Sequence, residues 1–313
     1  MALKELTKNT FILGLPKVIQ FFLKLVRAKL NAVFIGTEGV GIINQLNEVL
    51  KRLGNFSKLS LNVGAKKLIV DYNKDLQKRV ELPKIVGLFA LLIFGVVIVF
   101  FIIGLFFLDD LSNYFLSNQP KELFLVAFLV FPLLTLRTVP MTTLTGLMEF
   151  KSISKSEITV RIIAFVTFVP LIIYFGIQGA VANIVITNLL LLSAFAYYAF
   201  HKVAKKRGQR LITFKNLRIE KSAIKEFFTI SSAGTLLGIY AVFCHLTIRG
   251  ILASHLGMEK IGVYAPILAW SGFFSSFFVP ALLKYIYPKY GMSETNEELI
   301  SVANDGFRLV SFI

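Results

Sequence analysis

The sequence predicts an all-α membrane protein, a polytopic bundle of spanning helices, and three observations support this fold class. The 313-residue chain is 56% hydrophobic with a mean hydropathy of +0.72, whereas soluble domains average about 45–50% apolar residues. Its apolar residues form runs longer than the roughly 20 residues that cross a bilayer as a helix. Its Lys and Arg residues gather in alternate segments between these runs, as they do in the cytoplasmic loops of polytopic proteins.

The clearest predicted span covers Ile85–Leu108, which contains no charged residue. The uncharged stretch Ile162–Phe200 is too long for one helix, and Gly176 and Gly179 in its FGIQGA sequence predict a turn between two spans. Proline residues inside predicted spans are expected to produce bends or static kinks. The other spans are predicted at 9–35, 39–65, 123–147, 227–252 and 261–283, with the start of a ninth at 299–313.

The charges between these spans agree with this count. Summed over alternate loops, one set holds 20 Lys and Arg residues, and the other holds Lys121 and Lys260. This bias predicts that the N-terminus and the segments 66–84 and 201–225 are cytoplasmic. The chain is expected to divide into a first lobe of six helices (1–205), a basic cytoplasmic linker (206–222) and part of a second lobe with about three helices (223–313).

The segments 9–35 and 39–65 are amphipathic, and the polar residues of each recur every three or four positions on one helical face. A helix that lies on the membrane surface with this face in water is one interpretation. We favour two spanning helices whose polar faces line an aqueous cavity, because the loop charges alternate only if both helices cross. These faces contain Lys17, Gln20, Lys24, Arg27 and Asn31 in the first helix, and Asn44, Glu48, Lys51, Asn55, Lys58 and Asn62 in the second.

Further cations are expected within the membrane. Arg137 is predicted near the middle of its span, and Arg249 and Arg27 are predicted at similar depths. Arg161 lies nearer the end of its span, where an anchor at the membrane interface is an equal alternative. A central Lys or Arg costs about 2.5–3.5 kcal/mol in lipid, and Glu48 is the one obvious counter-charge, so an anionic substrate is expected. The candidate substrate-binding residues are Lys24, Arg27, Glu48, Lys51, Arg137, Arg161 and Arg249.

The sequence predicts no catalytic residue, metal site or cofactor. A net charge of +16 would suit a nucleic-acid-binding protein, but the composition leaves too little polar surface for one. Cys244 is the single cysteine and the three His residues are scattered, which excludes a disulfide framework and a Cys or His metal site. A membrane glycosyltransferase or polymerase would need a large outer loop with catalytic acids. The longest predicted outer loop, 109–122, is short, and we interpret its Asp109 and Asp110 as topology markers.

A shift of 221 residues reveals an internal repeat at two predicted outer turns. Parallel repeats of this kind build two-lobed transporters that bind their substrate between the lobes. A second lobe equal to the first would extend the chain well past 400 residues, so we expect this sequence to be part of a longer protein. The repeat aligns Ala32, Gly36, Glu38 and Gly41 with Ala253, Gly257, Glu259 and Gly262.

Three segments resemble bacterial O-antigen flippases of the Wzx type, in the multidrug, oligosaccharidyl-lipid and polysaccharide (MOP) exporter superfamily. They are AKLNAVFIGTEGVGIINQLNEVL (28–50), LNVGAKKLIVDY (61–72) and LGMEKIGVYAPI (256–267). The resemblance follows the whole chain in span order. It implies translocation of an undecaprenyl-pyrophosphate-linked oligosaccharide, an O-antigen or related polysaccharide unit, across the bacterial inner membrane. It also implies a cavity between two six-helix lobes, with polysaccharide assembly proteins as further partners.

Two other functions in the same superfamily remain open. One is a lipid II-type flippase, which would move a different pyrophosphate-linked lipid. The other is a drug or cation exporter, which would need acidic residues in its cavity, and the excess of Lys and Arg disfavours it.

Overall fold

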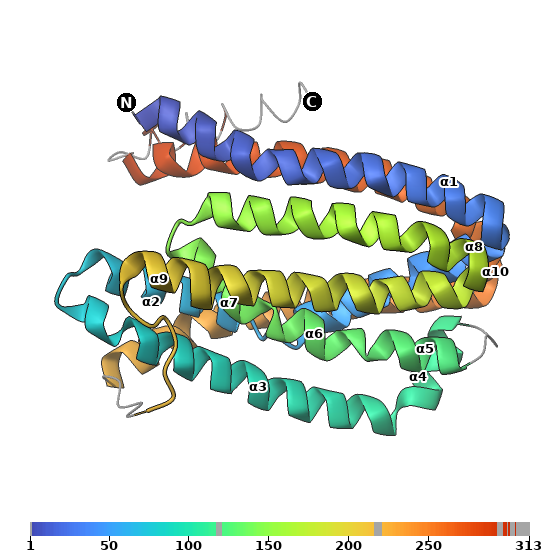
Figure 1. The fold of residues 1–313 in the computed structure, drawn as a ribbon, viewed down its shortest axis with the longest axis horizontal. Helices are drawn as coiled ribbons and strands as arrows, with labels where there is room; N and C mark the ends of the chain where they lie inside the picture. Colours follow the sequence, from blue (N-terminus) through green and yellow to red (C-terminus); the bar gives the residue numbers. More distant parts are fainter. Residues whose placement is uncertain are drawn as a thin grey trace.

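The computed structural model describes residues 2–116, 121–215 and 221–292, together with positions 297, 298, 300 and 304. Every regular element in these described ranges is a helix, as predicted (Figure 1). The predicted start of a ninth span at 299–313 lies outside the described residues except for positions 300 and 304. The helices are α1 (Ala2–Phe56), α2 (Leu61–Lys74), α3 (Leu82–Phe106), α4 (Leu108–Leu116), α5 (Lys121–Phe128), α6 (Val130–Leu136), α7 (Thr138–Gly146), α8 (Phe150–Tyr197), α9 (Ala204–Arg207) and α10 (Lys221–Met292), with a 3-10 turn at Lys78–Glu81 and a π-helical turn at Tyr198–Val203.

Three long helices each consist of two segments that meet at a glycine. The backbone angles (φ, ψ) are 69° and 178° at Gly36 in α1, 53° and −128° at Gly176 in α8, and 72° and 167° at Gly257 in α10. A positive φ is readily adopted only by glycine. The turn predicted at Gly176 is therefore present. Gly36 and Gly257, which the 221-residue repeat aligns, have nearly the same backbone conformation.

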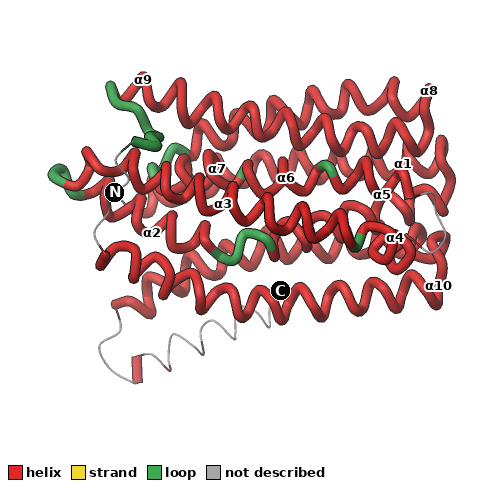
Figure 2. Tube along the Cα trace, turned by 90° about the horizontal axis from the view of Figure 1, so that it is seen from below, coloured by secondary structure: helices red, strands yellow, loops and turns green. Residues whose placement is uncertain are grey.

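The helices run along one common axis (Figures 1 and 2). The kinks of α1, α8 and α10 lie at the same end of the bundle as α4 and α5, on the right in Figure 1. The N-terminus, the connection between α2 and α3, and α9 lie at the opposite end. The structure thus places the Lys- and Arg-rich segments together at one end and the acidic segment around Asp109 at the other.

Four helical stretches in the described ranges are long and apolar enough to cross a membrane. They are Lys78–Phe106, Lys121–Gly146, Phe150–Arg207 and Phe227–Gly257, and the third includes the turn at Gly176 and so supplies two crossings. The helix α1 is too polar to belong to this set, yet it packs lengthwise against α8 and α10 (Figure 1). This multi-pass arrangement makes the protein an integral membrane protein.

The first half of α1 has several large apolar side chains on the outside of the bundle. Phe22 and Val33 are 62% and 70% exposed, whereas Asn31 is only 9% exposed. Arg27 is partly buried and lies over the ring of Phe168 in α8. Arg27 and Asn31 of the polar face are thus turned toward α8, whereas Lys17 and Lys24 stay exposed. Exposed apolar side chains on the opposite face favour the spanning interpretation over a helix whose polar face lies in water.

The predicted span 123–147 consists of three short helices, α5, α6 and α7, that continue one another. The backbone at the two junctions, Leu129 and Arg137, remains α-helical. Each junction lies three residues before a proline, Pro132 or Pro140. Proline lacks the N–H that would bond the carbonyl four residues earlier, so the ladder of hydrogen bonds is interrupted there. The helix is thus interrupted near these prolines, and Arg137 lies at one of the interruptions.

Two hydrophobic clusters hold the described part of the bundle together. One joins α2, α3, α7, α8 and the segment after it, and the other joins the second half of α1 with α4 to α6, α8 and α10. Ile43, Leu46 and Leu50 belong to the second cluster, and each is at most 8% exposed. The apolar face of the second amphipathic segment is thus buried, and the face that carries Glu48 and Lys51 points elsewhere.

Candidate functional site

Six of the seven predicted site residues come together in one electrostatic network. The guanidinium of Arg161 in α8 interacts with Lys24 and Arg27 of α1. Arg161 also interacts with Arg137, which follows α6. Lys24 in turn interacts with Lys51 and Glu48 in the second half of α1, and Lys58 interacts with Arg137. We call the cations of this network the cationic cluster, which consists of Lys24, Arg27, Lys51, Lys58, Arg137 and Arg161.

The guanidinium of Arg27 is held by aromatic rings of α8. Its Cζ atom lies 4.9 Å from the ring centroid of Phe168 and 6.0 Å from that of Phe165. A cation over an aromatic face gains about 0.5–2 kcal/mol without using any of its N–H groups. The Nε atoms of both Arg27 and Arg161 are buried without a hydrogen-bond partner among the described residues. Each arginine therefore retains a donor for an oxygen acceptor.

Arg137 is fixed by the second half of α8. Its Nη1 atom donates a hydrogen bond of 3.2 Å to Oδ1 of Asn188. The amide of Asn188 donates in turn to the carbonyl of Ile184, at 2.8 Å, so that its oxygen faces the arginine. Two residues before Arg137, the hydroxyl of Thr135 bonds the hydroxyl of Ser57 at 2.9 Å. These bonds fix the position of Arg137 within the helical stretch Lys121–Gly146.

Glu157 lies in the candidate site, although it is not among the residues that the sequence predicts. It is 8% exposed, lies one helical turn before Arg161, and interacts electrostatically with Arg161 and Arg137. One of its carboxylate oxygens is 4.0 Å from Nζ of Lys17. The expectation that Glu48 is the one counter-charge is therefore wrong. The spacing of four residues between Glu157 and Arg161, which favours an ion pair on a helix, was the available signal.

Glu48 is paired with both cations that follow it on α1. Its two carboxylate oxygens lie 3.5 Å from Nζ of Lys51 and 3.8 Å from Nη2 of Arg52. The network thus holds two carboxylates, Glu48 and Glu157, against the six members of the cationic cluster and Arg52. This excess of positive charge suits an anionic ligand.

Arg249 lies on α10 and bonds Gln45 of α1 rather than a member of the cationic cluster. Its Nη1 atom donates to Oε1 of Gln45 at 3.4 Å, and Nε2 of Gln45 donates to the carbonyl of Arg249 at 3.3 Å. Gln45 is fully buried, and the sequence analysis did not select it. His245, one turn earlier on α10, interacts electrostatically with Glu48, Lys51 and Arg249. Arg249 therefore contacts the same half of α1 that carries Glu48, but through a different partner.

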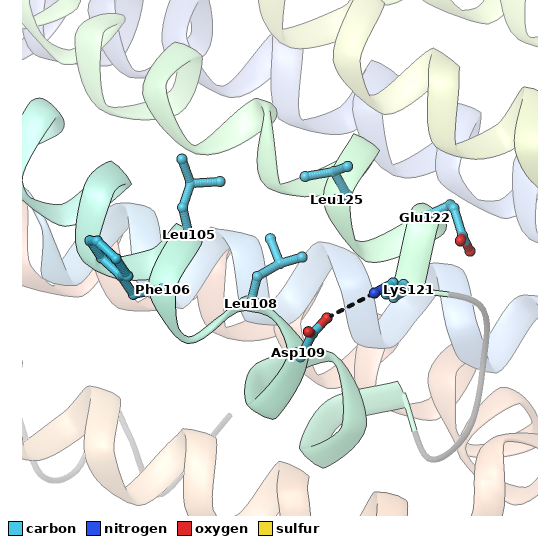
Figure 3. Close-up of a pocket in the computed structure, with 7 residues that line it drawn as sticks. All are labelled: Leu105, Phe106, Leu108, Asp109, Lys121, Glu122 and Leu125. Atoms are coloured by element: carbon cyan, nitrogen blue, oxygen red, sulfur yellow. Dashed lines mark ion pairs between the residues drawn. The ribbon is translucent and has the colours of Figure 1, made fainter.

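A separate groove lies at the end of the bundle that carries α4 and α5 (Figure 3). Asp109 and Lys121 form an ion pair of 3.5 Å across it, and both side chains are largely exposed. No member of the cationic cluster lines the groove, so it is not the candidate site. Within the described residues, no group of three His, Cys, Asp or Glu side chains could hold a metal ion. The groove is lined by Leu105, Phe106, Leu108, Asp109, Lys121, Glu122 and Leu125.

The fold is that of known transporters. The chain superposes on the inward-facing conformation of a MATE family multidrug resistance transporter of the MOP superfamily, with a TM-score of 0.70 and 13% identity over 96% of this chain and 70% of that one. A MOP superfamily transporter from Pyrococcus furiosus, described as having a binding pocket of reverse polarity, gives a TM-score of 0.64 and 14% identity, with coverages of 96% and 68%.

An outward-facing MATE family multidrug resistance transporter gives a lower TM-score of 0.54, with 14% identity and coverages of 90% and 69%. A comparison with curated proteins gave no match. The family model described as polysaccharide biosynthesis protein matches residues 6–292. This match covers most of the sequence, and the chain therefore belongs to the polysaccharide biosynthesis protein family, with the fold of the MOP superfamily.

Proposed function

We propose that this protein translocates an undecaprenyl-pyrophosphate-linked oligosaccharide, such as an O-antigen or related polysaccharide unit, across the bacterial inner membrane, with its own N-terminus in the cytoplasm. The family and the fold indicate a membrane transporter or flippase rather than an enzyme. The observation that carries the proposal is the cationic cluster, in which Arg27, Arg137 and Arg161 are partly buried and outnumber the nearby carboxylates.

The cluster matches the chemistry of a pyrophosphate headgroup. Such a group is too polar to enter hydrocarbon, so fixed donors must replace its hydration while the polyprenyl chain stays in lipid. The planar guanidinium binds phosphate oxygens through two parallel hydrogen bonds, whereas an ammonium acts as a point charge. We assign the pyrophosphate to Arg27 and Arg161, because each retains a buried donor, with Lys24 beside them.

The remaining predicted residues surround this position. Arg137 is held by Asn188 and supplies positive charge from the fourth span. Glu48 and Lys51 pair with each other and would bind sugar hydroxyls rather than phosphate. Arg249 contributes from the second lobe. We propose that its guanidinium, which bonds Gln45 in this structure, exchanges that acceptor for a phosphate or acidic sugar when substrate enters.

The alternatives within the superfamily differ in charge and headgroup. Two of the similar transporters are multidrug resistance proteins, but a cluster of uncompensated cations repels an organic cation. A lipid II-type flippase would use the same pyrophosphate chemistry. The sugar-binding surfaces beyond the cluster would distinguish it, and further partners among polysaccharide assembly proteins would follow from the glycan.

The proposal is tested by reconstitution. Proteoliposomes that contain the complete protein are loaded with a fluorescent polyprenyl-pyrophosphate oligosaccharide, and its transfer between leaflets is followed by an impermeant quencher. Arg27→Ala and Arg161→Ala should lower the transfer rate at unchanged protein incorporation, and Lys155→Ala, an exposed cation elsewhere on α8, should not. Equal transfer by all variants, or transfer of an organic cation instead, would contradict the proposal.

A further inference from the structure

Two segments at the Lys- and Arg-rich end of the bundle form an exposed surface with both apolar and basic side chains. The N–H of Thr213, after α9, donates a 3.1 Å hydrogen bond to the carbonyl of Pro83, at the start of α3. The loop after α9 therefore crosses the start of α3 (Figure 1). We call this surface the basic tip. It consists of Leu76, Val80 and Phe214, with Lys74, Lys78 and Lys215.

The apolar residues of the basic tip are among the most exposed in the described part of the chain. Leu76 is 75% exposed, Val80 is 77% exposed and Phe214 is 58% exposed. Their neighbours Leu82 and Leu211 are buried in the cluster that joins α2, α3 and α8. The two segments are thus attached to the bundle by buried leucines, and the exposed side chains extend from them into the surroundings.

Local hydrogen bonds fix the shape of the tip. Oδ1 of Asp75 accepts from the backbone N–H of Gln77 at 2.9 Å and of Lys78 at 3.4 Å. The guanidinium of Arg79 donates twice to the carbonyl of Asn73, at 2.8 and 3.3 Å. Nη1 of Arg207 donates to the side-chain oxygen of Asn73 at 2.7 Å, which ties α9 to the same turn. The exposure of Leu76 and Val80 is therefore a property of a preformed turn.

The basic tip carries an excess of positive charge. The carboxylate of Glu81 forms an ion pair with Nζ of Lys84 at 3.1 Å, and the carboxylate of Asp75 accepts a hydrogen bond from the turn backbone. The side chains of Lys74, Lys78 and Lys215 make no ion pair or hydrogen bond within the described residues. Three ammonium groups are therefore available to an anionic partner.

The position of the tip identifies that partner. The candidate membrane-spanning helix that includes α3 begins at Lys78, and its uncharged run follows from Ile85, so we place the tip where this helix would leave the membrane. Apolar side chains flanked by lysines are the pattern of segments that enter the headgroup region and bind anionic lipids. We infer that the basic tip is a binding surface for anionic phospholipid headgroups, with Leu76, Val80 and Phe214 among the upper acyl carbons and the three lysines on the phosphates.

This inference does not depend on which substrate the protein transports. It concerns the lipid around the first lobe, at the end that the loop charges predict to be cytoplasmic. A peripheral protein would be a different occupant, and it would leave the tip in water when the purified chain is placed in lipid alone.

The first experiment measures the depth of the tip. The full chain with Cys244→Ala and Leu76→Cys is labelled with an environment-sensitive fluorophore and reconstituted in phosphatidylcholine vesicles, with or without phosphatidylglycerol. We expect phosphatidylglycerol to protect the label from aqueous iodide and to expose it to quenching by spin-labelled lipid, and high salt to reverse both effects. A label that responds identically in the two vesicle types would overturn the inference.

The second experiment measures lipid binding directly. Native mass spectrometry compares how much phosphatidylglycerol the detergent-purified chain retains relative to phosphatidylcholine. Lys74→Gln with Lys78→Gln should weaken retention roughly thirtyfold. Lys151→Gln with Lys155→Gln, an equal loss of charge from exposed lysines of α8, should have a smaller effect. Equal losses in the two double variants would show only a non-specific charge effect and would refute the assignment.

Discussion

Gln45 and Arg249 exchange two hydrogen bonds between α1 and α10, and the side chain of Gln45 is fully buried at this contact. The next residue on α10, Gly250, lies directly against the ring of Tyr114 in α4, which a larger side chain would have to displace. The contact joins the second half of α1 to α10 at the end of the bundle that carries α4. Arg249 is therefore part of the interface between these two helices in this structure.

Gln45→Leu should destabilise the protein, because it removes both bonds and leaves the guanidinium of Arg249 without its acceptor. An unsatisfied partner of this kind costs about 1–3 kcal/mol. The measurement is thermal unfolding in detergent, with Asn47→Ala as the control, since the amide of Asn47 is exposed and bonds only the carbonyl of Ile43 in its own helix. Equal melting temperatures for the two variants would show that the Gln45 bonds do not hold α1 and α10 together.

Arg27, Arg137 and Arg249 should each be needed for export. Replacing any of them by Ala in the complete protein should abolish surface polysaccharide in a complementation assay without lowering membrane abundance. A lost hydrogen bond to a charged group is worth about 1.5–3 kcal/mol, or roughly 10- to 150-fold in affinity. Replacement by Lys should restore only part of the activity, because the bidentate geometry is lost. Normal export by all three Ala variants would remove the main support for an anionic substrate.

The spans and turns could be predicted because they depend on local sequence. Each long apolar run forms a helix, and a glycine with positive φ marks the turns at Gly36, Gly176 and Gly257. The break after α1, which interrupts the predicted span 39–65, has its positive φ at Leu59 and Ser60 instead, and no glycine marked it. The site could be predicted only in part. Lys24 and Arg27 lie on a polar face that the helical period selects, but Gln45 follows Asn44 by one position, which turns it about 100° toward the apolar side.

The burial of Glu157 could not be predicted from its own segment. It lies in KSISKSEITVR, where two lysines and three serines suggest the exposed start of a helix. Its low exposure results from residues more than a hundred positions earlier, around Lys17 in α1, which pack against this part of α8. Contacts between distant segments are set by the whole bundle and leave no periodic signal in the sequence.

The arrangement of the loops predicts a labelling pattern. Single cysteines at Lys74, Lys205 and Asn113 occupy exposed positions, the first two at the Lys- and Arg-rich end and the third in α4. In a Cys244→Ala background, an impermeant maleimide added to intact cells should label only the cysteine at Asn113. Labelling of the first two and not the third would reverse the proposed orientation, and permeabilised cells, in which all three should react, provide the control.

Glu157→Gln should lower stability and make it depend on an anion. The substitution keeps the size of the side chain but removes the carboxylate that faces Arg161, Arg137 and Lys17, so the repulsion within the cationic cluster increases. We expect a loss of roughly 1–2 kcal/mol, below that for a fully buried pair because Lys17 is half exposed.

Inorganic pyrophosphate should recover more stability in this variant than in the unaltered protein, because a bound anion replaces the missing negative charge. Thermal unfolding with and without pyrophosphate measures both effects, and Glu122→Gln, an exposed carboxylate of the distant groove, is the matched control. If pyrophosphate stabilises Glu157→Gln no more than it stabilises Glu122→Gln, the cluster does not bind the anion beside Glu157.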